Sequence, residues 1–205
     1  MTENQIENKA ERAVLVGLSC PGFTAEQDAD ERTMDELRAL AESADAEALG
    51  KNYRLTRDLD LEGAAFPGIG TAEHPFTGVF DGQGHTVKSF SVSGAENVGF
   101  FGVIRGATVK NLHLSEFSVT GEKRVGGLAG WSQAALDSED LAENVAGLIG
   151  NCTVAGSVTG GSRVGGLVGE NSGVYDEDTL FSIDCSVDRC SASVAVSGSG
   201  DSVGG

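Results

Sequence analysis

The chain has 205 residues and a formal net charge of −17, so it is long enough for one domain with a sizeable core and too acidic to favour nucleic-acid phosphates. No apolar run approaches the ~20 residues of a membrane-spanning helix. Glycine is abundant, with 30 residues, whereas proline is rare, with 3. Disordered low-complexity sequence is typically rich in both, so this composition indicates an ordered fold with many tight turns.

The first fifty residues, 1–50, predict one strand and one helix. Residues 13–18 form a short apolar run of strand length. After a polar, acidic loop over 21–31, we expect a helix over 33–49, because this segment has a capping-box pair, apolar residues at helical spacing and a terminal glycine. These residues are Thr33 and Glu36, then Leu37, Leu40 and Ala44, and finally Gly50. We interpret 1–50 as a strand–helix segment or as a helical cap.

Residues 51–205 predict an all-β domain with an internal repeat. Short alternating runs are separated by glycines, which is typical of strands joined by tight corners. Four segments align, and their opening glycines lie 27, 39 and 38 residues apart: Gly94, Gly121, Gly160 and Gly198. Two insertions, 132–142 and 172–180, account for the longer spacings, so the underlying period is about 27 residues.

A period of about 27 residues with three short strands is the size of one coil of a parallel β-helix. A coil cannot bury its apolar row alone, and stacking at about 4.8 Å pairs every strand with those above and below. Equivalent residues of successive coils should therefore form ladders. We expect three such ladders: Val119, Val158 and Val196; Thr120, Thr159 and Ser197; and Leu112, Cys152 and Cys190. Because in-register side chains point the same way, Cys152 and Cys190 are predicted to be buried, unbonded thiols.

The repeat carries a recurring glycine-rich motif, Val-Gly-Gly-Leu-x-Gly, at 125–130 and 164–169, with a variant at 98–102. Its residues are Val98, Gly99, Gly102, Val125, Gly126, Gly127, Leu128, Gly130, Val164, Gly165, Gly166, Leu167 and Gly169. The four large residues of the two full copies, Val125, Leu128, Val164 and Leu167, should be buried. A phosphate-binding loop would need a helix directly after the glycines, whereas apolar strand sequence follows here.

This motif resembles the GLUG repeat of bacterial secreted and surface proteins, and residues 53–61 and 76–87 resemble the segments that lead into such arrays. The resemblance covers about 33–205. It implies a right-handed parallel β-helix in an adhesin-like or cell-wall-associated protein, at the cell surface or outside the cell. It implies no catalytic chemistry and no cofactor, and a surface glycan or a host or cell-wall protein as partner. This chain itself shows no signal peptide.

Residues 11–48 have a second resemblance, to the opening of the HflX-type GTPases, which bind ribosomes. It rests on Glu11–Leu18, Pro21-Gly22 and Asp35–Ser43. No G-x-x-x-x-G-K-[ST] loop occurs in the chain, so the resemblance does not extend to GTP chemistry.

Three residues are candidates for chemistry or ligand binding. Asp81 and His85 lie in one glycine turn and invite comparison with β-helix enzymes that cut polysaccharides. Hydrolysis of a glycosidic bond needs two suitably placed carboxylates, so we interpret this pair as corner residues that form hydrogen bonds. Trp131 follows the second motif and either stacks on a sugar ring or packs under the insertion.

Acidic residues cluster in two other places. Asp58, Asp60 and Glu62 alternate along a strand, and Asp176, Glu177 and Asp178 lie in an insertion. Oxygen ligands of this kind can bind hard cations, but neither cluster has the spacing of a calcium-binding β-roll. We interpret both as solvated acidic faces and expect no metal.

The sequence therefore predicts a non-catalytic β-helical repeat module of a bacterial surface or secreted protein, with a role in adhesion or presentation. Two alternatives remain: a glycan-active β-helix enzyme that uses Asp81 and His85, and the remnant of a ribosome-associated GTPase without its nucleotide-binding domain. The chain stops within a repeat at Val203-Gly204-Gly205, so we also expect a longer array, a frayed last coil and end-to-end self-association.

Overall fold

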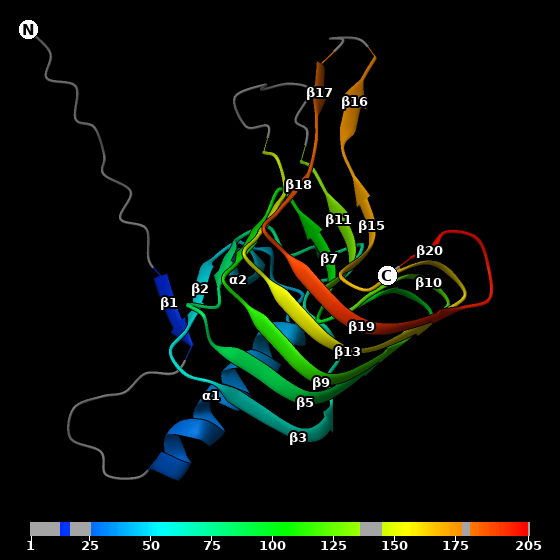
Figure 1. Cartoon of the computed structure of the whole chain (residues 1–205). Coiled ribbons are helices and arrows are strands. Elements are labelled where there is room, and N and C mark those ends of the chain that lie inside the picture. The colour runs from blue at the N-terminus through cyan, green and yellow to red at the C-terminus, as the bar shows by residue number, and fades with distance from the viewer. Residues whose placement is uncertain (1–12, 17–25, 136–144, 178–180, 205) are drawn as a thin grey trace, which may run out of the picture.

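The structure, a computed structural model, describes residues 13–16, 26–135, 145–177 and 181–204 (Figure 1). Within these ranges the chain is all-β apart from two N-terminal helices, α1 (Glu26–Ala41) and α2 (Ala46–Leu49). The strands form stacked parallel sheets, in which each repeat contributes a strand beside the equivalent strand of the repeat before it. Glycine-rich corners between the sheets make this stacking possible.

Four parallel sheets contain most of the strands. Sheet A has the order β1 (Ala13–Val16), β2 (Asn52–Leu55), β4 (Val79–Asp81), β8 (Thr108–Lys110), β12 (Leu148–Gly150) and β18 (Ser186–Asp188). Sheet B has the order β3 (Leu59–Ala65), β5 (Thr86–Ser93), β9 (His113–Thr120), β13 (Thr153–Gly160) and β19 (Ser191–Gly198). Sheet C has β7 (Phe101–Arg105), β11 (Ala129–Gln133) and β15 (Val168–Ser172). Sheet D has β6 (Glu96–Val98), β10 (Lys123–Gly126), β14 (Ser162–Gly165) and β20 (Val203–Gly204).

The register of these sheets confirms the ladders expected from the repeat. Val119 pairs with Val158 and Val158 with Val196, while Thr120, Thr159 and Ser197 form the adjacent row. The third ladder is also present, because the amide of Thr153 donates to the Leu112 carbonyl and that of Ser191 to the Cys152 carbonyl. Residues one repeat apart in sequence are therefore direct neighbours in space.

The core is aromatic near the N-terminal end and thins toward the C-terminal end. Phe76, Phe80, Phe100 and Phe101 are fully buried, and the rings of Phe90 and Phe117 stack with centroids 5.6 Å apart. In contrast, β18 is exposed throughout, and β19 has only two partly buried positions.

The motif residues follow the same gradient. Val125, Leu128 and Val164 are buried as expected. Leu167 is only partly buried, contrary to the expectation, because sheet C ends at β15 and no further strand stacks on its outer side among the described residues.

The N-terminal segment differs from the single helix expected over 33–49. Thr33 lies inside α1 rather than capping it, and residues 26–31, expected as loop, are helical. The chain leaves α1 after Ala41, and α2 begins at Ala46 after the N-cap Asp45, whose side chain accepts a hydrogen bond from the Glu47 amide at 3.0 Å. A new N-cap of this kind satisfies an amide that would otherwise lack a partner, so it favours a break.

Other N-terminal expectations are confirmed. Residues 13–16 of the strand expected over 13–18 form β1, which extends sheet A by pairing in parallel with β2, and residues 17 and 18 lie outside the described residues. Leu37 and Leu40 are buried in the common core, and Gly50 ends α2. No helix in the described part of the chain is long and apolar enough to cross a membrane.

The second insertion forms an antiparallel hairpin of β16 (Val174–Asp176) and β17 (Phe181–Ile183). Figure 1 shows this hairpin extending away from the stacked sheets. The helical turn expected over 136–141 in the first insertion lies outside the described residues.

Only one of the two thiols of the third ladder is buried as expected. Cys152 is fully buried, whereas Cys190 is partly exposed because the last repeat has no repeat stacked on its outer side among the described residues. Burial raises the pKa of the Cys152 thiol to about 12.

We expect a thiol-alkylating reagent at pH 8 to modify Cys190 in the native protein and to leave Cys152 unmodified, because the thiolate is the reactive form. Peptide mapping by mass spectrometry after brief labelling checks this. Cys152 should become modified only in denaturant. Equal native labelling of both residues would show that the last two repeats are not stacked as described.

Candidate functional site

Asp81 ends β4 and is tied to the next repeat. Its Oδ1 accepts hydrogen bonds of 2.9 Å from the Gln83 amide and from Asn111 Nδ2, and Lys110 Nζ lies 3.4 Å from Oδ2. Asn151 Nδ2, one repeat further, donates to Asn111 Oδ1 at 2.9 Å. Asp81 is therefore the first member of a polar ladder that links three repeats.

This environment keeps the Asp81 carboxylate ionised. Burial alone would raise its pKa, but the hydrogen bonds from Asn111 and the Gln83 amide, together with the Lys110 charge, hold the pKa below its ordinary value. A lowered pKa suits a structural acceptor, whereas a general acid working near neutral pH needs a raised one.

The ladder predicts an acid-dependent contribution to stability. A folded-state pKa below the unfolded value of about 3.9 means that the stabilisation is present above that value and is lost as pH falls through the folded pKa. We expect Asp81→Asn to lower the free energy of unfolding by about 1 kcal/mol at pH 7, and to lose less stability than the wild type on acidification below about pH 4.

Urea unfolding at pH 7, 5, 4 and 3 measures this difference. Glu122→Gln is the matched control, because Glu122 is exposed and forms no ion pair among the described residues. Parallel stability-versus-pH curves for the wild type and Asp81→Asn would contradict the proposed ladder.

His85 has a different partner from Asp81. Its Nδ1 lies 3.2 Å from Oδ1 of Asp58, one repeat earlier, and the same oxygen accepts the Thr86 amide at 2.8 Å. The Thr86 hydrogen bond, with help from His85, lowers the pKa of Asp58. In the described part of the chain, no hydrogen bond joins Asp81 to His85. The turn therefore does not assemble these two side chains into an acid–base pair.

Trp131 on β11 is held by a charged network. The Arg124 guanidinium lies over the indole, 4.2 Å from the ring centroid, and the indole Nε1 donates to Ser172 Oγ at 2.9 Å. Arg124 Nε also donates to Glu170 at 2.8 Å, and Arg163 donates to the same carboxylate oxygen at 2.7 Å. One face of the ring is thus covered by a cation, which occupies a surface that a sugar would need.

The Arg124 network was not identified from the sequence. A usable signal exists, since Arg124 and Arg163 occupy the same position before the motif valine, and both adopt a positive φ, of 56° and 52°. Asn97, the equivalent residue one repeat earlier, has a φ of 57° and accepts a hydrogen bond from Arg124. This column forms a left-handed corner in successive repeats.

The acidic clusters do not converge on a common centre. Asp60 forms an ion pair of 2.9 Å with Lys88 and accepts the Glu62 amide, while Asp58 faces His85. Among the described residues, no group of three or more His, Cys, Asp or Glu side chains could hold a metal ion. Part of the acidic segment 176–178 lies outside the described residues.

The motif glycines lie where adjacent repeats approach most closely. A Cβ on Gly130 would come closer than 3.0 Å to the backbone of Asn97 and Val98 in the previous repeat. A Cβ on Gly126 would come equally close to the backbone of Gly169 in the next repeat. The motif is therefore explained by backbone packing between repeats.

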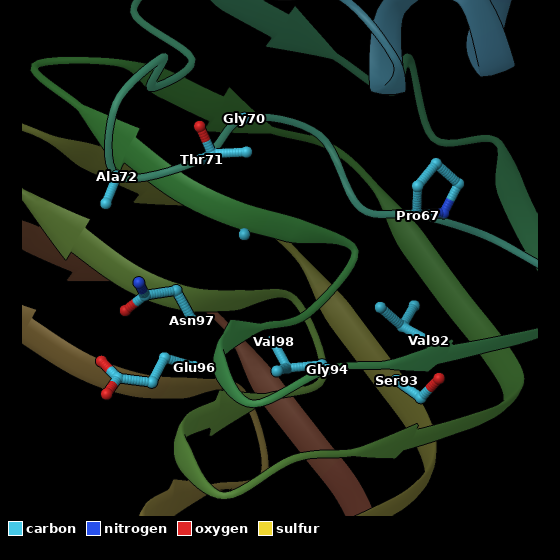
Figure 2. Close-up of a pocket in the computed structure, with 11 residues that line it drawn as sticks. Pro67, Gly70, Thr71, Ala72, Val92, Ser93, Gly94, Glu96, Asn97 and Val98 are labelled. Atoms are coloured by element: carbon cyan, nitrogen blue, oxygen red, sulfur yellow. The ribbon is translucent and has the colours of Figure 1, made fainter.

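One cavity, of about 150 Å³, opens beside β6. Figure 2 shows Glu96, Asn97 and Val98 of β6 on one side and the loop residues Thr71 and Ala72 on the other. Pro67, Gly70, Val92, Ser93, Gly94 and Gly102 complete the lining. The cavity contains neither Asp81, His85 nor Trp131.

Comparison with known proteins gives a limited set of similarities. No family model matches the chain. It is 34% identical over 161 residues, 71% of its length, to halomucin from Haloquadratum walsbyi, and it spans 2% of that protein. In structure it is similar to a candidate immunoglobulin A1 protease from Bacteroides ovatus, with a TM-score of 0.57, 24% identity and coverage of 78% of this chain and 45% of the other. The structural likeness concerns the fold alone.

Proposed function

We propose that the chain is a right-handed parallel β-helix of the GLUG-repeat type and serves as a non-catalytic module of a secreted or cell-surface protein, with a role in adhesion or presentation. The stacked, in-register sheets and the period of about 27 residues support the architecture. The similarity to a segment covering 2% of halomucin supports a module within a much longer protein.

The observation that carries the non-catalytic role is the use made of the candidate residues. Asp81 is tied to Lys110 and Asn111, His85 to Asp58, and Trp131 is covered by Arg124. The partners of Asp81 and His85 come from neighbouring repeats. Trp131 shares its repeat with Arg124 but donates to Ser172 of the next one. Side chains that hold repeats together are not free to approach a substrate, so we interpret all three as structural.

The β16–β17 hairpin is the best-placed surface for presentation. It stands away from the sheets in Figure 1, and Tyr175 on β16 is 57% exposed. An exposed tyrosine offers an apolar ring and a hydroxyl group, which suits contact with a glycan or a protein surface. We propose that this hairpin contacts the partner.

The first fifty residues act as a cap in this proposal. β1 adds a strand to the outer edge of sheet A, and Leu37 and Leu40 of α1 enter the common core. These contacts favour a cap over the remnant of a GTPase, because a remnant would have no reason to complete the sheet.

A glycan and cell-wall panel tests the proposal. The wild type should bind at least one surface component without releasing reducing sugars or unsaturated products. Tyr175→Ala should weaken that binding, and Val203→Ala, at a site also exposed but on β20, should leave it unchanged. Reproducible turnover that disappears in Asp81→Ala would establish the glycan-active enzyme instead, and binding to nothing in the panel would contradict adhesion.

A further inference from the structure

The cavity beside β6 lies at the edge where sheet D ends. Sheet D begins at β6, whereas sheets A and B continue past the same repeat with β2 and β3. The preceding repeat reaches sheet C directly, since Ile69 bridges to Phe101 and Phe76 to Ile104. That repeat therefore contributes to three of the four sheets and omits sheet D.

A shortcut in the chain creates this vacancy. Ala65 pairs with Ser91, and Ile69 already bridges to Phe101. Residues 65–69 thus connect two positions that the next repeat connects through the longer path 91–101. The corner formed by that longer path has nothing stacked on its outer side, and its residues line the cavity.

The edge of β6 facing the cavity has unused hydrogen-bonding groups. Lys123 of β10 pairs with Glu96, and its amide donates to the Ala95 carbonyl. In a parallel ladder, alternate residues direct both backbone groups to opposite neighbours. Glu96 and Val98 therefore point their N–H and C=O groups away from β10, and these groups have no hydrogen-bond partner in the described part of the chain.

The charge at this edge favours a basic guest. The Glu96 carboxylate lies 3.4 Å from Arg124 Nη1 and 3.7 Å from Lys123 Nζ, both in the next repeat, and the Glu96 side chain is 52% exposed. A guest strand paired with the free edge of β6, opposite β10, would bring its own side chains about as close to Glu96 as Lys123 and Arg124 are. In a chain with a net charge of −17, a basic side chain is the favourable one there.

We propose that the vacancy docks a short extended segment of a partner protein that carries a basic side chain and adds to β6 as a parallel strand. This surface differs from the β16–β17 hairpin, and the inference does not depend on the adhesion role.

A synthetic peptide that copies residues 121–128, GEKRVGGL, is the probe. In the free protein, the amides of Glu96 and Val98 should exchange rapidly with deuterium. At about 1 mM peptide their exchange should slow by at least about tenfold, as for amides that gain a strand partner. The Asn97 amide, which faces β10, is the internal control and should be slow in both states.

Backbone methylation of the peptide tests the strand register. The peptide amides copied from Arg124 and Gly126 would face β6, so N-methylation of these two should abolish binding. N-methylation of the amides copied from Lys123 and Val125, which would face away, should leave binding intact. Equal binding of both methylated peptides would overturn the proposal, because it would mean adsorption by charge alone.

Two protein variants complete the test. Glu96→Gln should weaken peptide binding about two- to fivefold, the range of a partly exposed ion pair, and Glu122→Gln, with the same change of charge one repeat further, should not. Unchanged exchange of Glu96 and Val98 at saturating peptide would overturn the proposal. So would protection of these amides without peptide in a self-associated chain, because a second copy would then occupy the edge.

Discussion

Replacing Gly130 by alanine is expected to destabilise the protein by about 3 kcal/mol or more, at or above the upper end of overpacking costs. The new Cβ would come closer than 3.0 Å to the backbone of Asn97 and Val98 in the previous repeat. Backbone atoms in a stacked sheet cannot rotate aside as a flexible side chain can. The two repeats would have to separate, which would weaken the pairing of β6 with β10.

Urea unfolding followed by far-ultraviolet circular dichroism measures this effect. Gly150→Ala is the control, because the nearest atoms to its new Cβ belong to the Leu148 side chain, at 4.0 Å. That change should be close to neutral, within about 1 kcal/mol. Similar costs at both glycines would mean that the motif glycines are not required by contact between repeats.

Truncating Leu128 to alanine is expected to cost about 2–5 kcal/mol, the range for a fully buried leucine. Leu128 has no exposed surface and lies in the common core. The equivalent change one repeat later, Leu167→Ala, should cost less, about 1–2 kcal/mol, because Leu167 is only partly buried.

Paired unfolding curves of the two leucine variants provide the comparison. The two residues occupy the same motif position, so intrinsic propensity and unfolded-state effects largely cancel. A larger cost at Leu167 than at Leu128 would contradict the decline of the core toward the last repeat.

Residues that repeat at a fixed spacing could be predicted well from the sequence. Val119, Val158 and Val196 align by inspection, and stacking of identical coils leaves one consistent register. The helix boundaries were less predictable, because the Thr33–Glu36 pattern competes with a second cap at Asp45. The longer spacing between repeats indicated an insertion at 172–180, but it gave no indication that this insertion contributes to the β16–β17 hairpin.

The polar contacts were predictable in kind but not in detail. Asp81 was expected to accept hydrogen bonds, yet its partner Asn111 lies 30 residues away, and the partner of His85 lies 27 residues away. Both distances are close to the repeat period. Searching one period away from each polar side chain would have identified these pairs, and also Asn97 as a partner of Arg124.

The vacancy beside β6 could not be predicted, because chain length alone does not distinguish a missing strand from a shorter corner. Residues 66–78 are 13 in number and their counterpart 92–107, which includes β6 and β7, has 16. The difference is local: Pro67 lacks an amide proton for a ladder, and Thr71 instead donates to the His74 carbonyl in a turn. These residues take up chain length without forming a strand.

Backbone nuclear Overhauser effects across sheet B test the central claim, which is that equivalent residues of successive repeats stack in parallel register. In the uniformly labelled protein, we predict cross-peaks that connect Val92 to Val119, Val119 to Val158, and Val158 to Val196, as their pairing requires. The cross-peaks should link α-protons to amide protons of the neighbouring strand, as in parallel sheets. Cross-peaks of antiparallel pattern, or contacts confined within single repeats, would contradict the account.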